Sequence, residues 1–217
     1  MNLETGTFMN YHAKEPDWYP ANGYHLRRAP EHLRFWLSDP DSLTARLLAA
    51  SDGDFRVQVL CQGWRRVMSN ETAALSCSTE ESAFIRHVHL ICMGRPWVFA
   101  RTVIPANNLK GPMHALTKLG NKPLGAYLFS RPNLKRGPLE LVRLQAGQRL
   151  HQEALNQSLM AGSENGKTAI WGRRSTFTLE GGPLLVSEFF LPNLLRGSKW
   201  QPPRKDKLIR KPVLEEA

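Results

Sequence analysis

Alternating hydrophobic and polar residues predict β-strands over much of this chain. The clearest pair is 82–93 and 97–104, which residues 94–96 (Gly-Arg-Pro) join as a tight turn. The stretch 182–192 predicts a further strand, because it is short, rich in large apolar residues and bounded by glycine and proline. The predicted strands are 54–67 with a break near Gly63, 82–93, 97–104, 139–144, 169–179 and 182–192.

Helical periodicity appears between the predicted strands. A helix is expected after the start signal Ser-Asp-Pro at 38–40, and Gly53 ends it. Leu43, Leu47 and Leu48 give this helix an apolar face. Further helical segments are predicted at 107–119, 123–129 and 146–160, with a loop or short helical turn at 71–78 and a flexible loop at 162–166.

These elements predict a single α+β domain, with about six antiparallel strands and helices on one side of the sheet. The two short helices at 107–119 and 123–129 are expected to cap an internal pocket. A length of 217 residues suits one sizeable core. Residues 1–30 show no clear period and are expected to form a loose N-terminal arm, so the domain proper is predicted to cover 31–196.

Charge and cysteine content narrow the class of protein. The net charge is +10, and much of it lies in the sequence SKWQPPRKDKLIRK at 198–211. We interpret 197–217 as a solvated flexible tail, with a weak contact to membrane or nucleic acid as the alternative. The three cysteines form no CxxC pair, and the N-terminus has no apolar signal segment. No apolar run approaches the ~18 residues of a membrane span. These features indicate a cytoplasmic protein.

Two charged residues within apolar strands are the candidate site residues. Glu188 must either point to solvent or be held by partners, because burying a lone carboxylate is costly. Arg86 shares a strand face with Val88 and Leu90. Its guanidinium would bind either Glu188 in a structural ion pair or the carboxylate of a ligand. Both readings stay open from these residues alone. Nearby arginines at 173–174 add positive potential.

The sequence offers little for a metal or a cofactor. His87 and His89 could both reach one ion from a strand, but no further ligand has matching spacing, so we interpret them as polar outward residues. Neither GxGxxG, GxxxxGK[ST] nor GxSxG occurs. We therefore expect no metal and no cofactor.

Several ordered blocks together resemble the chorismate pyruvate-lyase family. No single block would be specific, but their order and spacing fit from about residue 30 to 195. The blocks are GRPW at 94–97, ARTVIP at 100–105, LGNKPLGAYLF at 119–129, WGRRS at 171–175 and GPLLVSEFFLP at 182–192, with a weaker match for DSLT at 41–44.

The resemblance implies a six-stranded antiparallel sheet with helical flaps over a sequestered pocket. It also implies roles for individual residues. Arg86 stands where the family's substrate-carboxylate arginine stands, and Glu188 matches the acid that meets the ring hydroxyl. Leu124 lies in the flap whose main chain meets the ligand carboxylate. Leu43 falls where the family can have methionine, again a main-chain contact.

The function implied is conversion of chorismate to 4-hydroxybenzoate and pyruvate, without a cofactor, at the first committed step of ubiquinone biosynthesis. We expect a monomer whose partners are this substrate and product, with no nucleic acid. A ligand sensor of the same fold is the alternative, although such regulators carry a DNA-binding domain ahead of it. The chain departs from the family by an insertion of about 20 residues around 145–168 and by its basic tail.

Overall fold

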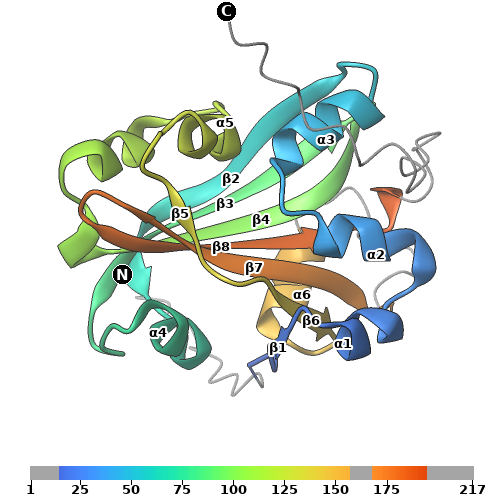
Figure 1. Cartoon of the computed structure of the whole chain (residues 1–217), viewed down its shortest axis with the longest axis horizontal. Coiled ribbons are helices and arrows are strands. Elements are labelled where there is room, and N and C mark those ends of the chain that lie inside the picture. The colour runs from blue at the N-terminus through green and yellow to red at the C-terminus, as the bar shows by residue number, and fades with distance from the viewer. Residues whose placement is uncertain (1–14, 157–167, 195–217) are drawn as a thin grey trace, which may run out of the picture.

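One antiparallel sheet organises the fold in a computed structural model that describes residues 15–156 and 168–194. The strand order is β1-β6-β7-β8-β4-β3-β2, and β5 pairs with β7 beside this path (Figure 1). The strands are β1 (Tyr19–Pro20), β2 (Phe55–Arg66), β3 (Ser82–Cys92), β4 (Arg95–Pro105), β5 (Lys135–Arg136), β6 (Glu140–Leu144), β7 (Ile170–Leu179) and β8 (Gly182–Phe190).

The sequence predicted the six longer strands and missed the two shortest. The sheet has eight strands because β1 and β5, of two residues each, add to the predicted six. A strand of two residues has no alternation that a sequence pattern could reveal. β1 belongs to the expected N-terminal arm and pairs with β6, so this part of the arm extends the sheet.

Two details of the predicted strands were wrong. β2 continues through Gly63, and its irregularity is a register shift between Val59 and Cys61. The turn between β3 and β4 lies at Met93 and Gly94, with positive φ angles of 50° and 70°. Two successive positive φ angles are typical of the tight turns that match strand twist, and the second falls on glycine.

The helices agree with the prediction in part. The α3 helix forms within the expected segment, but it begins at Leu43 with Ser42 at its N-cap, because Ser38 ends the preceding helix. Leu48 is exposed, while Leu43 and Leu47 are buried. The α2 helix was missed, although it buries Leu33, Trp36 and Leu37 at helical spacing. The helices are α1 (Gly23–Arg28), α2 (Glu31–Ser38), α3 (Leu43–Ala50), α4 (Ser69–Leu75), α5 (Leu124–Phe129) and α6 (Arg149–Asn156).

The segment predicted as one helix at 107–119 forms two 3₁₀ helices instead. They are η1 (Ala106–Asn108) and η2 (Gly111–Lys118). Gly111 has a φ of 51°, and Pro112 follows it without an N–H group. Both features interrupt an α-helical hydrogen-bond ladder, which explains the correction.

Helices cover both faces of the sheet, so the prediction of helices on one side was wrong. On the near face of Figure 1 lie α2, α3, η2 and α5, while α6 lies behind the sheet. The α6 residues Leu150 and Ala154 pack with Phe99 and Phe189, and Leu75 of α4 packs with Ile85. These strand residues alternate with Arg86 and Glu188, so α4 and α6 bury the face opposite the candidate site residues.

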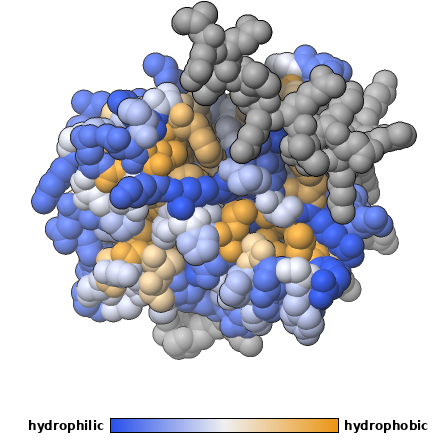
Figure 2. Space-filling view, viewed as in Figure 1, coloured by the Kyte–Doolittle hydropathy of each residue, from blue (hydrophilic) through white to orange (hydrophobic). Residues whose placement is uncertain are grey.

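Hydrophobic residues come to the surface of the near face in separate areas, with hydrophilic residues between them (Figure 2). None of the helices within the described part of the chain is long and apolar enough to cross a membrane. The predicted loop at 162–166 and the tail at 197–217 lie outside the described residues, and the domain boundaries stay a prediction.

Candidate functional site

A cavity lies on the near face of the sheet, between two groups of core residues. One group packs α2 and α3 on the sheet, and the other packs η2 and α5 on it. The cavity volume is about 50 Å³, whereas ligand pockets measure roughly 300–1,000 Å³. The covering helices must therefore move apart to admit a ring-sized ligand. Charged side chains reach the cavity from several elements: Asp41, Arg86, Arg136, Arg173 and Glu188.

Arg86 reaches the cavity from the middle of β3 and is only 3% exposed. Its Nη2 donates hydrogen bonds to the carbonyl oxygens of Gly120 at 2.7 Å and Lys122 at 3.4 Å. Its Nε is buried and has no hydrogen-bond partner among the described residues. Burial lowers the pKa of Arg86, but a guanidinium stays protonated at neutral pH. Arg86 thus offers a free donor and a positive charge to an anion in the cavity.

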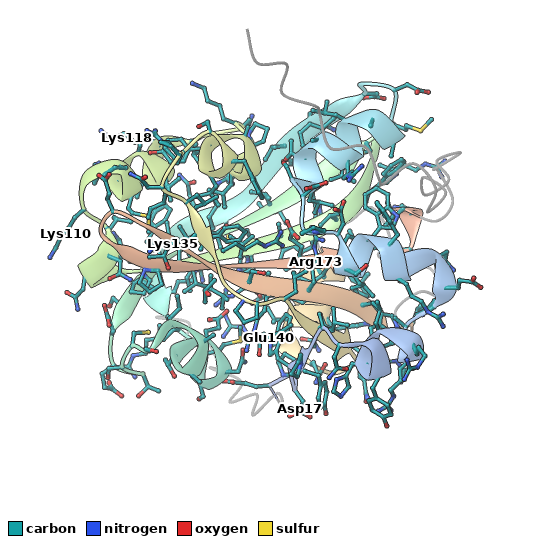
Figure 3. All side chains as sticks on the ribbon, in the orientation of Figure 1. Asp17, Lys110, Lys118, Lys135, Glu140 and Arg173 are labelled. Atoms are coloured by element: carbon teal, nitrogen blue, oxygen red, sulfur yellow. The ribbon has the colours of Figure 1, made fainter. Side chains whose placement is uncertain are left out.

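Glu188 is held by Arg173 and makes no ion pair with Arg86. Arg173 Nε donates to Glu188 Oε2 at 2.7 Å, and Arg173 Nη1 donates to the carbonyl oxygen of Asp39 at 2.7 Å. The structural ion pair between Arg86 and Glu188, which the sequence left open, is therefore ruled out in this structure. Arg173 lies at the centre of the sheet (Figure 3), and it fixes the carboxylate at one side of the cavity.

The pairing of Arg173 with Glu188 had a signal in the sequence that our prediction did not use. Glu180 and Gly181 form a two-residue turn between β7 and β8, since Leu179 pairs with Gly182. Counting back along both strands from this turn brings Arg173 directly opposite Glu188. A hairpin with a known turn fixes its own register, so this contact was predictable.

The two predicted main-chain contacts also lie at the cavity. Leu43 is the first residue of α3 and Leu124 the first of α5, and both line the cavity. Neither helix has a side-chain hydrogen bond at its N-cap. The helices approach closely, since a Cβ on Gly125 would lie 2.9 Å from Thr44 Oγ1. Glycine at this position lets α5 close over the cavity against α3.

Arg136 is a cavity residue that the sequence analysis missed. It belongs to β5, which crosses over the sheet in Figure 1. Its Nε donates to Ser175 Oγ at 3.2 Å, and its Nη1 donates to the carbonyl oxygen of Pro40. No periodicity surrounds this residue, so its position at the cavity could not be predicted from a local pattern. Arg174, by contrast, pairs with Glu140 at 2.7 Å and does not line the cavity.

His87 and His89 are buried on the opposite face, so their prediction as outward residues was wrong. Arg101 makes two bonds of 2.6 and 2.8 Å to the Glu71 carboxylate, and its Nη1 lies 2.7 Å from His87 Nε2. Burial, followed by the charge of Arg101, lowers the pKa of His87 to about 3. His87 Nε2 then accepts from Arg101 and cannot carry a proton of its own. Glu153, 3.9 Å from the same nitrogen, is too distant to hydrogen-bond it.

No group of three or more histidine, cysteine or acidic side chains suited to a metal occurs in 15–156 and 168–194. On the face opposite the cavity, Arg101 hydrogen-bonds both the Glu71 carboxylate and the Nε2 of His87, and His89 Nε2 lies 3.4 Å from the Ala154 carbonyl oxygen. This face therefore holds a structural network, and the cavity face holds the candidate site.

The sequence profile of the Chorismate lyase family matches residues 15–199. The chain belongs to the chorismate lyase family. A protein of Thiobacillus denitrificans named "Probable chorismate pyruvate-lyase" is 39% identical over 82% of this chain and 90% of its own length. A protein of the same name from Azoarcus sp. is 42% identical over 78% of this chain and 88% of its own length. The family match includes the β1 and α1 segments, which the sequence analysis assigned to the arm.

The chain is also similar, at a greater distance, to a solved structure. A GntR-family transcriptional regulator from Bacillus cereus aligns with 64% of this chain and 93% of its own chain, at 11% identity and a TM-score of 0.46. A likeness at this distance does not bear on function. Membership of the chorismate lyase family rests on the sequence relatives.

Proposed function

We propose that this protein is a chorismate pyruvate-lyase that converts chorismate to 4-hydroxybenzoate and pyruvate. The observation that supports this most directly is the arrangement of Arg86 and Glu188 around a cavity that apolar and charged side chains line together. Arg86 would bind the ring carboxylate, because its buried Nε lacks a partner within the described residues. Glu188, held by Arg173, would accept a hydrogen bond from the ring hydroxyl at the opposite end of the ligand.

The sheet register gives the two groups a suitable separation. Arg86 pairs with Thr102 of β4, and Glu188 pairs with Ala100 of the same strand. Two residues along a strand and two strand spacings across the sheet separate their Cα atoms by about 12 Å. Side chains extending inward from both ends leave room for one six-membered ring with para substituents, once the covering helices move apart.

Main-chain groups would complete the binding of the ring carboxylate. Leu43 and Leu124 line the cavity as the first residues of α3 and α5, where a main-chain N–H has no partner within its own helix. A main-chain donor does not depend on the side chain, so leucine at 43 is compatible with a family position that can hold methionine. The carbonyl oxygens of Gly120 and Lys122 now accept from Arg86, and a ligand carboxylate would replace them as its partner.

The reaction then needs a conformation more than it needs a strong base. The ether bond between ring carbon 3 and the enolpyruvyl oxygen breaks, and that oxygen becomes the carbonyl of pyruvate. The hydrogen on ring carbon 4 moves to the enolpyruvyl methylene and makes the methyl group, while the ring becomes aromatic. Atoms and electrons balance within the substrate. Holding the reactive conformer can contribute ~7–11 kcal/mol at best.

The test is incubation of the purified protein with chorismate, with 4-hydroxybenzoate and pyruvate followed together by chromatography. We expect both products in equal amounts, and loss of turnover in Arg86→Met. Arg95→Met is the matched control, because Arg95 is an exposed arginine at the start of β4 and lies away from the cavity. Binding of chorismate without turnover would indicate a ligand sensor. A protein that neither binds chorismate nor turns it over would refute the proposal.

We further infer that the product enters ubiquinone biosynthesis and that the protein acts as a cytoplasmic monomer, with residues 31–196 as its domain. The separated hydrophobic areas in Figure 2 support a monomer on the face shown. Deletion of the gene should lower ubiquinone, and added 4-hydroxybenzoate should restore it. Sedimentation should give a mass near 24.6 kDa. A dimer mass, or no effect on ubiquinone, would refute the corresponding inference.

A further inference from the structure

The cavity contains more positive charge than the described carboxylates neutralise. Three arginines line it: Arg86, Arg136 and Arg173. Of the two carboxylates that line it, Glu188 pairs with Arg173 at 2.7 Å and Asp41 pairs with Arg46 at 2.7 Å. Within the described residues, neither Arg86 nor Arg136 has a carboxylate within the 4.0 Å of an ion pair. Two arginines are therefore available for anionic groups of a ligand, and chorismate has two carboxylates.

Arg136 is held in place by neutral partners. A hydroxyl and a main-chain carbonyl accept its hydrogen bonds, from Ser175 and Pro40. The third partner is the ring of Phe177, whose centroid lies 5.2 Å from the guanidinium carbon. Burial, followed by the charge of Arg173, lowers the pKa of Arg136. A half-buried guanidinium with only neutral partners attracts an anion strongly, because its charge is poorly solvated.

Arg136 lies on the same side of the cavity as Glu188. Ser175 and Phe177, which Arg136 contacts, follow Arg173 on the same face of β7. The main-chain partners also adjoin, since Arg136 bonds to the carbonyl of Pro40 and Arg173 to that of Asp39. Arg86 projects from β3, which β4 and β8 separate from β7. The two available arginines therefore approach the cavity from opposite sides.

We propose that Arg136 binds the carboxylate of the enolpyruvyl group and stabilises it as pyruvate departs. This rests on the proposed function. In chorismate the enolpyruvyl ether is on ring carbon 3, next to the hydroxyl on carbon 4 that Glu188 would meet. A ligand with its ring carboxylate on Arg86 thus has its second carboxylate near Arg136. The guanidinium can donate two parallel bonds to a carboxylate, and no group outside substrate and protein is needed.

An outer groove adjoins this side of the cavity. Its lining includes Phe129 and Arg136, which also line the cavity, and Pro40, which bonds to Arg136. Because Arg136 and Phe129 line both spaces, a leaving group bound to Arg136 would lie next to the outer groove.

Equilibrium binding of two stable ligands tests the proposal without turnover. One is 4-hydroxybenzoate, which has only the ring carboxylate. The other is 3-carboxymethoxy-4-hydroxybenzoate, which carries a second carboxylate on an ether oxygen at ring carbon 3. We expect Arg136→Met to weaken the dicarboxylate on the order of 10- to 100-fold and the monocarboxylate by less than about threefold. Arg86→Met should weaken both ligands.

Lys135→Met is the matched control, because Lys135 is the exposed neighbour on β5 and its loss changes the net charge equally (Figure 3). It should leave both affinities within about twofold. Arg136→Lys, which keeps the charge and loses the fork, should give an intermediate loss for the dicarboxylate and covers the case in which Arg136→Met does not fold.

Kinetics give the second readout and separate the two proposals. In an active wild type, Arg136→Met should lower kcat/KM for chorismate by at least about tenfold. An equal loss of both ligands, or an unchanged kcat/KM, would overturn the assignment of Arg136 while the lyase activity stands. A wild-type protein that neither binds chorismate nor turns it over would overturn the proposed function itself, and this inference with it.

Discussion

The ion pair between Arg173 and Glu188 gives a prediction whose size follows from the structure. Replacing Arg173 by methionine leaves the Glu188 carboxylate without its cation and the Asp39 carbonyl without its donor. The side chains of Arg173 and Glu188 are 2% and 18% exposed. Breaking a fully buried pair costs about 3–5 kcal/mol, and the exposure of Glu188 favours the lower end. With about 1 kcal/mol for the carbonyl, Arg173→Met should lower the free energy of unfolding by about 4 kcal/mol.

A double-mutant cycle tests the reasoning more strictly than this single value. Glu188→Gln removes the carboxylate charge that Arg173→Met leaves unpaired. In the Arg173→Met background it should therefore lower the free energy of unfolding by less than in the wild type, or raise it. We expect a coupling of about 2 kcal/mol between Arg173 and Glu188. Urea denaturation measures all four proteins, and equal m-values would show that the unfolding transition is comparable.

Arg174→Met is the matched control for this cycle. Arg174 is the next residue on β7, is also buried, and pairs with Glu140 on the opposite face of the sheet. It shares no described partner with Glu188, so the same cycle with Glu188→Gln should give a coupling within about 0.5 kcal/mol of zero. If the coupling between Arg173 and Glu188 were also within about 0.5 kcal/mol of zero, Arg173 would not stabilise the Glu188 carboxylate. Our account of how Glu188 is held would then be wrong.

Three further predictions concern pH, packing and catalysis. The pKa of His87 is about 3 in the folded protein, below its ordinary value of about 6.5. At pH 5 only the unfolded chain takes up this proton. The free energy of unfolding should therefore be full above pH 6.5 and lower by up to about 2 kcal/mol at pH 5. His87→Gln should remove this slope in urea titrations, and an unchanged slope would contradict the burial of a neutral imidazole. Gly172→Ala should lower the free energy of unfolding by about 2–4 kcal/mol, because the new Cβ would lie 2.6 Å from Phe189 Cδ1 and 2.9 Å from the Glu188 carbonyl oxygen. A melting temperature equal to that of the wild type would refute this. Glu188→Gln should keep part of the activity in the chorismate assay if Glu188 positions the hydroxyl, whereas a folded but inactive variant would identify it as the base.

Much of the candidate site was accessible from local patterns. Alternation along β3 set Arg86, Val88 and Leu90 on one face, and all three line the cavity. The apolar stretch that contains Glu188 forms β8 as predicted. The position of Arg173 opposite Glu188 also follows from the two-residue turn between β7 and β8. These features depend on neighbours in sequence or on one hairpin.

Other features could not be predicted because they depend on segments far apart in the chain. The burial of His87 and His89 requires helices on the second face, where His89 Nε2 lies 3.4 Å from the Ala154 carbonyl, 65 residues away. Arg136 occupies a strand of two residues, and its bond to Pro40 spans 96 residues. Neither contact leaves a period in the sequence.

The sequence by itself determined the six longer strands, the alternation of side chains along each of them and the family. It did so because strand alternation is a property of local backbone geometry, and because the family blocks are read in order along the chain. The tertiary structure alone decided which charges are neutralised and which remain available to a ligand. Arg173 meets both Glu188 and Asp39, a residue 134 positions away, whereas Arg86 and Arg136 meet only neutral groups among the described residues. Those pairings depend on which strands and helices pack together, and only the folded chain brings them within hydrogen-bond distance.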